Sequence, residues 1–226
     1  MDAFIAIEPN YLMATADGSS TIHSSQFNAS YHSLHGALQE SRHVFIQNGL
    51  NAFGLVSESE LSILEIGFGS GLNALLAWNW ANQNKIPVNY TGCEPYPINL
   101  AMLSDFELAD AGSTEQFQDL HQCNWDVAHR LAPEFTFQKT TQTWPNFKVE
   151  SPVDIIWYDA FSPAAQPELW DKSALQACVD SLRSGGIWVS YCAKGDVRRM
   201  LIELGCDVER LPGPPHKRHM LRACKR

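Results

Sequence analysis

The fold is decided by residues 63–73, Ile63-Leu64-Glu65-Ile66-Gly67-Phe68-Gly69-Ser70-Gly71-Leu72-Asn73. An apolar strand here runs into three glycines and then into a helix. Glycine lets the backbone turn tightly and lets a ligand approach main-chain N–H groups that a Cβ atom would block. The N-terminus of the following helix adds unpaired donors and the positive end of a dipole. This stretch therefore predicts a nucleoside-binding turn in an α/β sheet, the alternative being glycines that serve only a tight turn.

Strand and helix patterns alternate from residue 61 onward. Helical stretches of 10–15 residues separate the strands, which predicts βαβ units and a parallel sheet covered on both faces. The last two strands are joined by Pro212-Gly213-Pro214-Pro215, which leaves no room for a helix, so we expect them to be antiparallel. The expected strands are 62–66, 88–94, 136–140, 153–158, 187–191, 206–211 and 219–224, and the expected helices are 72–84, 98–108, 169–183 and 196–204.

This layout is a mostly parallel, seven-stranded sheet with an antiparallel last strand. It is typical of the Rossmann-like class I S-adenosylmethionine-dependent methyltransferases, an α/β fold. Residues 1–60 have a different pattern, because two short strands flank Asp17-Gly18 and a helical spacing follows over residues 33–47. We expect residues 1–60 to form an N-terminal extension, a β-hairpin and a helix that belong to the same domain and can cover a cleft. Residues 61–226 are expected to form the Rossmann-like methyltransferase domain.

Two acids indicate which nucleoside binds. The second strand ends at Glu94, where a carboxylate can accept hydrogen bonds from both hydroxyls of a ribose. The turn has the pattern G-x-G-x-G with Glu65 just before it, whereas the dinucleotide pattern is G-x-G-x-x-G. A carboxylate at this place would repel a pyrophosphate, but the cationic sulfonium and ammonium of S-adenosylmethionine tolerate it. We therefore predict S-adenosylmethionine as the cofactor, with a nicotinamide enzyme as the alternative. The candidate cofactor-binding residues are Glu65, Gly67, Phe68, Gly69, Gly71, Asn73 and Glu94.

A second candidate constellation, Asp159-Ala160-Phe161-Ser162-Pro163, follows the strand at 153–158. In parallel α/β sheets ligands bind at the carboxyl ends of the strands, so Asp159 is expected on the same edge as Gly67 and Glu94. We take Asp159 as the candidate catalytic residue, the alternative being a cap of the next turn. Phe161 and Pro163 are candidate substrate-binding residues that can form an apolar wall against a planar substrate.

Several motifs together resemble the methyltransferase half of the MnmC family of bifunctional tRNA-modifying proteins. They are Gly67–Asn73, Asp159–Pro163 with Pro167-Glu168-Leu169-Trp170, Lys217-Arg218-His219-Met220, Asp17-Gly18-Ser19 and Glu40-Ser41-Arg42-His43-Val44-Phe45. The resemblance covers nearly the whole chain. It implies methylation of the primary amine of 5-aminomethyl-(2-thio)uridine at the tRNA wobble position, with Asp159 beside the amine. A carboxylate can orient such an amine and help to remove its proton.

Two features depart from that family. The flavin-dependent half has no room in 226 residues, and no second glycine-rich fingerprint follows the first. We therefore expect a stand-alone methyltransferase that relies on a separate flavin-dependent enzyme, or another partner, for its aminomethyl substrate. The third strand is followed by Thr140-Thr141-Gln142, where many methyltransferases place an Asp against the adenine amine. How the adenine is recognised is therefore left open.

Charge is distributed unevenly along the chain. Nine of the sixteen Lys and Arg residues and four acids lie in residues 194–226, so this segment carries a net charge of +5 and the rest of the chain −14. An acidic body does not attract a polyanion, but a basic C-terminal edge can, the alternative being a solvated basic face. The further candidate substrate-binding residues are Glu40, which could equally be a surface glutamate, and Lys194, Lys217 and Arg218. Binding of tRNA is expected to be weak or assisted by a partner.

Composition narrows the remaining possibilities. No apolar run approaches the ~20 residues that a membrane helix requires, and the N-terminal residues 1–4 lack the basic and apolar regions of a secretory signal. The six cysteines are scattered without a C-x-x-C pair, which argues against a zinc site or a disulfide framework. We expect a cytoplasmic protein without a membrane span or a metal site. Two other functions stay open: a methyltransferase for a small-molecule or protein amine, and a non-catalytic nucleoside-binding partner subunit.

Overall fold

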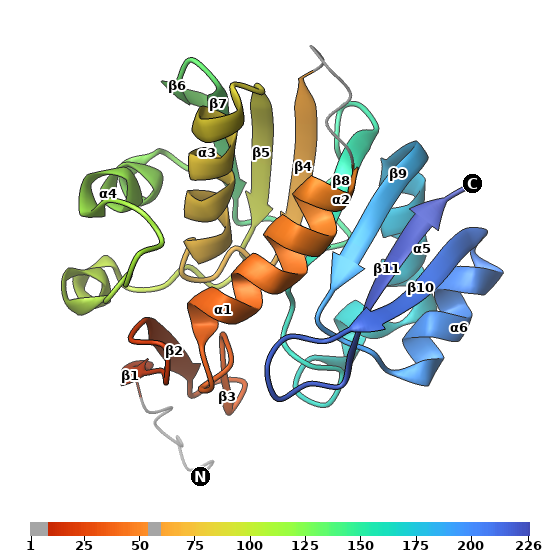
Figure 1. The fold of residues 1–226 in the computed structure, drawn as a ribbon, viewed down its shortest axis with the longest axis horizontal. Helices are drawn as coiled ribbons and strands as arrows, with labels where there is room; N and C mark the ends of the chain where they lie inside the picture. Colours follow the sequence, from red (N-terminus) through yellow and green to blue (C-terminus); the bar gives the residue numbers. More distant parts are fainter. Residues whose placement is uncertain (1–8, 54–59) are drawn as a thin grey trace, which may run out of the picture.

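The computed structural model describes residues 9–53 and 60–226. At its centre is an eight-stranded sheet in the order β10-β11-β9-β8-β4-β5-β7-β6 (Figure 1). The contacts between β9, β8, β4, β5 and β7 are all parallel. The strands of this sheet are β4 (Leu61–Ile66), β5 (Val88–Cys93), β6 (His129–Ala132), β7 (Phe135–Thr140), β8 (Val153–Tyr158), β9 (Leu182–Ser190), β10 (Cys206–Pro212) and β11 (His219–Lys225).

The predicted class I layout is confirmed, with one correction to the number of strands. The last two strands form the expected antiparallel hairpin, and β11 also pairs antiparallel with β9. The expected sheet had seven strands, but β6 adds an eighth that pairs antiparallel with β7. Its four residues are all at least partly exposed, so the sequence lacks the apolar run that identifies a buried strand.

Helices cover both faces of the sheet. The predicted helix at 72–84 is α3 (Leu72–Asn84), α5 (Lys172–Ser181) lies within the predicted 169–183, and α6 (Gly195–Glu203) begins one residue before the predicted 196–204. The expected helix at 98–108 was wrong, because only a short 3-10 turn, η2 (Leu100–Asp105), forms there. A regular helix follows instead at α4 (Thr114–Gln122). It begins with a capping box in which the side chains of Ser113 and Gln116 bond each other's backbone N–H groups, a local signal that the sequence did contain.

The strand β8 shows why the central strands lack a clean polar alternation. Ile155 and Trp157 point to the face covered by α3 and by the N-terminal helical run, and they join one apolar cluster. Ile156 and Tyr158 point to the opposite face and pack in a second cluster with Leu175 of α5. Both faces are buried, so the strand reads as a nearly continuous apolar run without polar alternation.

The N-terminal extension contains a small antiparallel sheet and a continuous helical run. The sheet consists of β1 (Tyr11–Ala14), β2 (Ser20–Ser24) and β3 (Ala29–Ser30), with the predicted turn at Asp17-Gly18 between the first two strands. The helical run consists of α1 (Ala37–Ser41), the π-helical segment η1 (Arg42–Leu50) and α2 (Asn51–Phe53), later than the expected 33–47. In Figure 1 the small sheet lies beyond the carboxyl ends of the parallel strands. None of the described helices is both long and apolar enough to cross a membrane.

Candidate active site

The glycine-rich turn is shaped by two close approaches. Gly67, Gly69 and Gly71 all have positive φ, at 96°, 50° and 80°. A Cβ atom on Gly67 would lie 2.6 Å from the carbonyl oxygen of Asp159, and one on Gly69 would lie 2.6 Å from Cδ1 of Tyr31. Only glycine fits both the backbone conformation and the space at these positions. The turn therefore brings the end of β4 into contact with the end of β8 and with the N-terminal extension.

The N–H groups of the turn are largely used inside the protein. Gly67 and Phe68 both donate to the carbonyl oxygen of Cys93, at 3.0 and 3.1 Å, and Gly71 donates to that of Phe68. The N–H of Gly69 donates to Oε2 of Glu94 at 2.9 Å. A pyrophosphate is bound by N–H groups that point at its oxygens, and here four such groups are already engaged. This arrangement argues against a dinucleotide.

Glu94 is held rigidly at the end of β5. Its second oxygen, Oε1, accepts a hydrogen bond from the N–H of Tyr96 at 2.9 Å. Burial raises the pKa of Glu94 to about 7, and the two backbone hydrogen bonds oppose that rise. Because each carboxylate oxygen has a second lone pair, the group can still accept hydroxyl donors from a ligand. The side chain is therefore placed and oriented to take the hydroxyls of a ribose.

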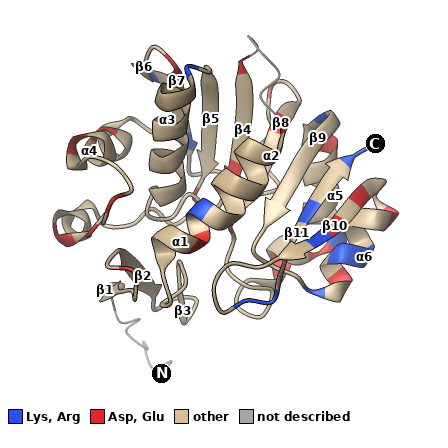
Figure 2. Ribbon diagram, in the orientation of Figure 1, with Lys and Arg blue, Asp and Glu red and all other residues tan. Residues whose placement is uncertain are grey.

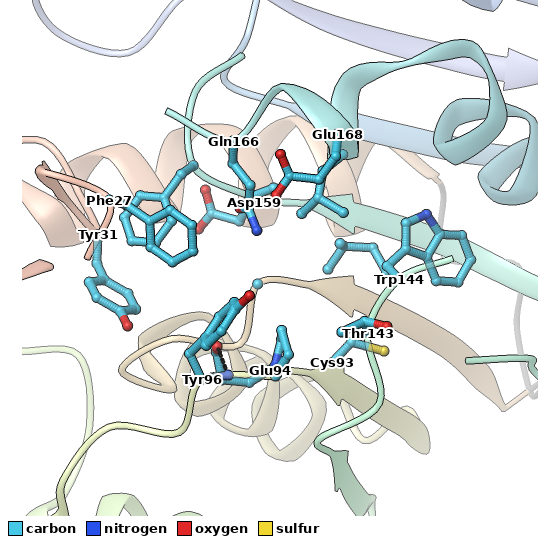
Figure 3. A pocket seen from close by; sticks show the side chains of 16 residues that line it. Phe27, Tyr31, Cys93, Glu94, Tyr96, Thr143, Trp144, Asp159, Gln166 and Glu168 are labelled. Carbon is cyan, nitrogen blue, oxygen red and sulfur yellow. Dashed lines mark hydrogen bonds between the residues drawn. The ribbon is translucent and has the colours of Figure 1, made fainter. Parts of the chain in front are cut away.

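A cavity of about 270 Å³ opens between the ends of β4, β5 and β8 (Figure 3). Three of its lining residues carry a carboxylate, namely Glu94, Asp159 and Glu168, and none of the described lining residues is Lys or Arg. An anionic site of this kind suits a cationic ligand such as a sulfonium or an amine. The residues that line it are Phe27, Tyr31, Ile66, Gly67, Cys93, Glu94, Pro95, Tyr96, Thr143, Trp144, Asp159, Ala160, Phe161, Gln166, Glu168 and Leu169.

Asp159 lies directly after β8 with its carboxylate on this cavity. Its Oδ2 accepts a hydrogen bond from Nδ2 of Asn73 at 2.8 Å. Burial, followed by the nearby charge of Glu40, raises the pKa of Asp159 to about 7, while Asn73 and Lys217 oppose the rise. A carboxyl group that titrates near neutral pH can take up and release a proton under ordinary conditions.

Asn73 and Glu65 lie behind the turn. Nδ2 of Asn73 also donates to Oε1 of Glu65 at 2.8 Å, and the hydroxyl of Tyr90 donates to Oε2 of Glu65 at 2.6 Å. Glu65 is fully buried and lies outside the cavity lining. Oδ1 of Asn73 is buried without a hydrogen-bond partner in the described part of the chain. Asn73 also lies outside the cavity lining, so it contacts the site through Asp159.

Aromatic side chains from the N-terminal extension form one wall of the cavity. The ring of Phe161 packs against Phe27 and Tyr31, with centroids 4.7 and 4.9 Å apart, and Phe27 also packs against Tyr96 at 5.3 Å. The sequence predicted an apolar wall at Phe161, but it gave no sign of Phe27 or Tyr31. No local pattern marks these two residues, because their place depends on how the extension packs on the sheet.

Of the other predicted substrate residues, the fold brings Glu40 and Lys217 together away from the cavity lining. Oε2 of Glu40 lies 2.6 Å from Nζ of Lys217, and the same nitrogen lies 4.2 Å from the ring centre of Tyr191. Glu40 is buried, whereas Lys194 and Arg218 are exposed, and none of these three lines the cavity.

Two further candidates, Pro163 and Phe68, also lie outside the lining of the cavity. Pro163 is half-buried beyond the cavity, and the ring of Phe68 fills the space beside Gly71 and Gly92, beneath the turn. The loop after β7 is the place where many methyltransferases put an Asp against the adenine amine. Thr140 is buried and donates to Oδ1 of Asp126 at 2.6 Å, so it serves the local structure. Thr143 and Trp144, three and four residues further along this loop, do line the cavity.

Comparison with known proteins agrees with this geometry. Residues 135–226 match the family described as S-adenosyl-L-methionine-dependent methyltransferase. The chain is 33% identical over 232 aligned positions to "tRNA 5-methylaminomethyl-2-thiouridine biosynthesis bifunctional protein MnmC" from Aromatoleum aromaticum, which covers 96% of this chain and 35% of that protein. It is 31% identical to the protein of the same name from Ralstonia nicotianae, over 87% of this chain and 32% of that protein.

A solved structure shows the same fold over nearly the whole chain. The crystal structure of MNMC2 from Aquifex aeolicus superimposes with a TM-score of 0.81 at 25% identity, and the match covers 97% of this chain and 72% of that one. The chain belongs to the S-adenosyl-L-methionine-dependent methyltransferases. The predicted resemblance to the methyltransferase part of MnmC, the fold and the cofactor class are thereby confirmed. The methyltransferase spans about a third of the length of the two MnmC proteins.

Proposed function

We propose that this methyltransferase methylates the primary amine of 5-aminomethyl-(2-thio)uridine at the wobble position of tRNA. The two MnmC relatives are named for the biosynthesis of tRNA 5-methylaminomethyl-2-thiouridine, and that product carries one methyl group on such an amine. The observation that carries the proposal is the carboxylate of Asp159 in an anionic cavity, next to the glycine-rich turn. This is the place where a primary amine can be held beside the methyl donor.

The residues of the turn and the strand ends would hold the cofactor. Gly67 lines the cavity, Gly69 and Gly71 allow the tight backbone of the turn, and Glu94 would accept the ribose hydroxyls. We assign Phe68 and Glu65 to the support of the turn, because neither lines the main cavity. When bound, S-adenosyl-L-methionine supplies a methyl group made electrophilic by the sulfonium.

Asp159 would prepare the acceptor. A free alkylamine is mostly protonated at neutral pH, and a protonated nitrogen has no lone pair with which to attack. The Asp159 carboxylate can bind the ammonium, orient it and accept its proton, since the pKa of Asp159 is raised to about 7 by burial and by Glu40. The aromatic wall of Phe27, Tyr31 and Phe161 offers a flat apolar surface to the planar uracil ring. The extension is then part of the same domain as the sheet, because it completes the site.

The tRNA would approach from the C-terminal edge. Figure 2 marks Lys and Arg positions in blue on α6, on β11 and on the loop that joins β10 to β11. We assign Lys194 and Arg218, both exposed, to phosphate contacts. Few such residues face an otherwise acidic chain, so binding should be weak and sensitive to salt, or assisted by a partner. A separate flavin-dependent enzyme would supply the aminomethyl group, and the cytoplasm, where tRNA is modified, is the expected compartment.

The test is methyl transfer from labelled S-adenosyl-L-methionine to tRNA that carries 5-aminomethyl-2-thiouridine. Asp159→Asn is measured beside the wild type, because it keeps the size of the side chain and removes the base. Digestion to nucleosides and mass spectrometry should show methylaminomethyl-2-thiouridine with the wild type. The variant should be slower by a factor on the order of 10² or more, and cofactor affinity by calorimetry should change little. Glu203→Gln, which removes a carboxylate on the exposed surface of α6, serves as the control.

Other outcomes would favour the alternatives. Transfer to small amines or to a protein but not to the tRNA would point to another acceptor. Tight cofactor binding without transfer to any amine would point to a non-catalytic partner subunit. Unchanged tRNA methylation by Asp159→Asn would remove Asp159 from the proposed role while leaving the substrate assignment intact.

A further inference from the structure

Four polar side chains form one hydrogen-bonded chain behind the glycine-rich turn. The hydroxyl of Tyr90 contacts Oε2 of Glu65 at 2.6 Å, and Nδ2 of Asn73 lies 2.8 Å from Oε1 of Glu65 and 2.8 Å from Oδ2 of Asp159. We call these four residues the Glu65 network. They come from β5, β4, α3 and the loop after β8, so the network joins four separate elements around the glycine-rich turn.

Glu65 cannot act on a ligand in the main cavity directly. Its side chain is 0% exposed, and Tyr90 and Asn73 are 1% and 2% exposed. A buried carboxyl group costs folding free energy unless its oxygens are hydrogen-bonded, and here both oxygens are. Only the Asp159 end of the network reaches the cavity. The effect of Glu65 on the reaction must therefore pass through Asn73.

We propose that Glu65 and Tyr90 are positioning residues, which fix the Asp159 carboxylate by locking the side-chain amide of Asn73. The inference rests on the proposed role of Asp159 as the group that receives the amine. An amide has two N–H donors on one nitrogen, and here one points at each carboxylate. Rotation of the amide would break both hydrogen bonds together. Tyr90 in turn fixes the orientation of Glu65, so the position of Asp159 is set by groups that never meet a substrate.

The charges around the network are consistent with this role. Burial raises the pKa of Glu65 to about 8, with a smaller contribution from Asp159, so Glu65 is mostly protonated at neutral pH. Two adjacent buried carboxyl groups do not both ionise readily, which leaves the negative charge on Asp159. On the other side of Asp159, Glu40 raises its pKa and Lys217 lowers it. The hydrogen bond from Asn73 stabilises the charged form, and loss of its anchor weakens that bond.

The experiment compares Glu65→Ala, Glu65→Gln and Tyr90→Phe in the full chain. Glutamine can accept from Asn73 and donate to Tyr90, so Glu65→Gln should keep most of the activity, whereas Glu65→Ala should lower kcat about tenfold or more. In Glu65→Ala the hydrogen bond from Asn73 to Asp159 weakens, which raises the pKa of Asp159. The acid limb of the kcat–pH profile should therefore move to higher pH by about half a unit. Tyr90→Phe should show the same changes at smaller size.

Asp154→Ala is the matched control. It also removes a buried carboxylate of the sheet, which accepts from the N–H and hydroxyl of Ser62 at 2.8 Å, but it lies at the opposite end of β8 from Asp159. This variant should lower the melting temperature without moving the acid limb. An equal loss of kcat in Glu65→Ala and Asp154→Ala, with unmoved acid limbs, would reduce Glu65 to a structural residue and overturn the inference. So would a large loss of cofactor affinity in Glu65→Gln with kcat unchanged at saturating cofactor.

A second readout separates this inference from the proposed function. The titration of the Asp159 carboxyl carbon, followed by carbon-13 NMR without any acceptor, should midpoint at higher pH in Glu65→Ala than in the wild type. An unchanged midpoint overturns the inference, whatever the substrate is. A shifted midpoint supports the inference even if the wild type does not methylate the tRNA, and in that case only the tRNA assignment fails. If Glu65→Ala does not fold, the titration midpoint of Asp159 in Tyr90→Phe decides the inference by the same criterion.

Discussion

Gly67 and Asp159 touch through their backbones at the floor of the site. A Cβ atom on Gly67 would lie 2.6 Å from the carbonyl oxygen of Asp159 and 2.9 Å from its carbonyl carbon. The N–H of Asp159 in turn donates to the carbonyl oxygen of Ile66 at 2.9 Å. The cofactor turn and the proposed catalytic carboxylate are therefore parts of one rigid junction between β4 and β8.

This junction predicts a large cost for Gly67→Ala. The methyl group would collide with backbone atoms that cannot move aside, and the φ of 96° is itself strained for alanine. We expect the free energy of unfolding to fall by about 3 kcal/mol. Gly205 has a φ of 91° with nothing within 4 Å of its Cβ position, so Gly205→Ala should cost only about 1 kcal/mol. Urea denaturation of both variants measures the difference, and equal losses would mean that φ alone matters.

Glu94→Gln should weaken cofactor binding. The carboxylate accepts the N–H groups of Gly69 and Tyr96, and an amide nitrogen cannot accept the hydrogen bond from one of them. Charged hydrogen bonds to the ribose would be lost as well, each worth about 1.5–3 kcal/mol. The Kd for S-adenosyl-L-methionine should therefore rise at least about tenfold by calorimetry. An affinity equal to that of the wild type would place the ribose elsewhere.

The two members of the Glu40–Lys217 ion pair should shift the acid limb of the kcat–pH profile in opposite directions. Glu40 raises the pKa of Asp159 and Lys217 lowers it. Glu40→Gln should therefore move the acid limb of kcat to lower pH, and Lys217→Met should move it to higher pH, each by about half a unit. Asp159 acts as a base, so the Lys217→Met enzyme should be the slower of the two at pH 6. Shifts in the same direction would show that both variants act by loosening the extension and not by charge.

Stability should fall as pH rises, and Glu65 should be one cause. The pKa of Glu65 is raised by burial from 4.5 to about 8, so the folded state prefers the protonated form. This contribution is fully present below the ordinary pKa and is lost as pH rises through about 8. Glu65→Gln cannot ionise, so its melting temperature should decline less between pH 5.5 and 8.5, by about 2–4 °C. Parallel curves for the two proteins would show that Glu65 does not ionise in this range.

Local patterns predicted much of the framework. The helix at 72–84, the strand at 153–158 and the turn at Gly67–Gly71 follow from periodicity and from glycine, which depend on neighbours in the chain. The edge position of Asp159 also followed, because parallel strands present their carboxyl ends together. The number of strands did not follow, since β6 is short and half-exposed, and the helix at 98–108 was predicted where only a 3-10 turn forms.

By itself, the sequence determined the class I sheet, the glycine-rich turn and the two acids at strand ends, because each is encoded by residues that are close in the chain. Only the tertiary structure decided that Glu65 faces inward to Tyr90 and Asn73, and that Phe27 and Tyr31 line the cavity. Only the fold pairs Glu40 with Lys217. These contacts join distant segments, and they depend on strand order and on the packing of the extension, which local spacing does not specify.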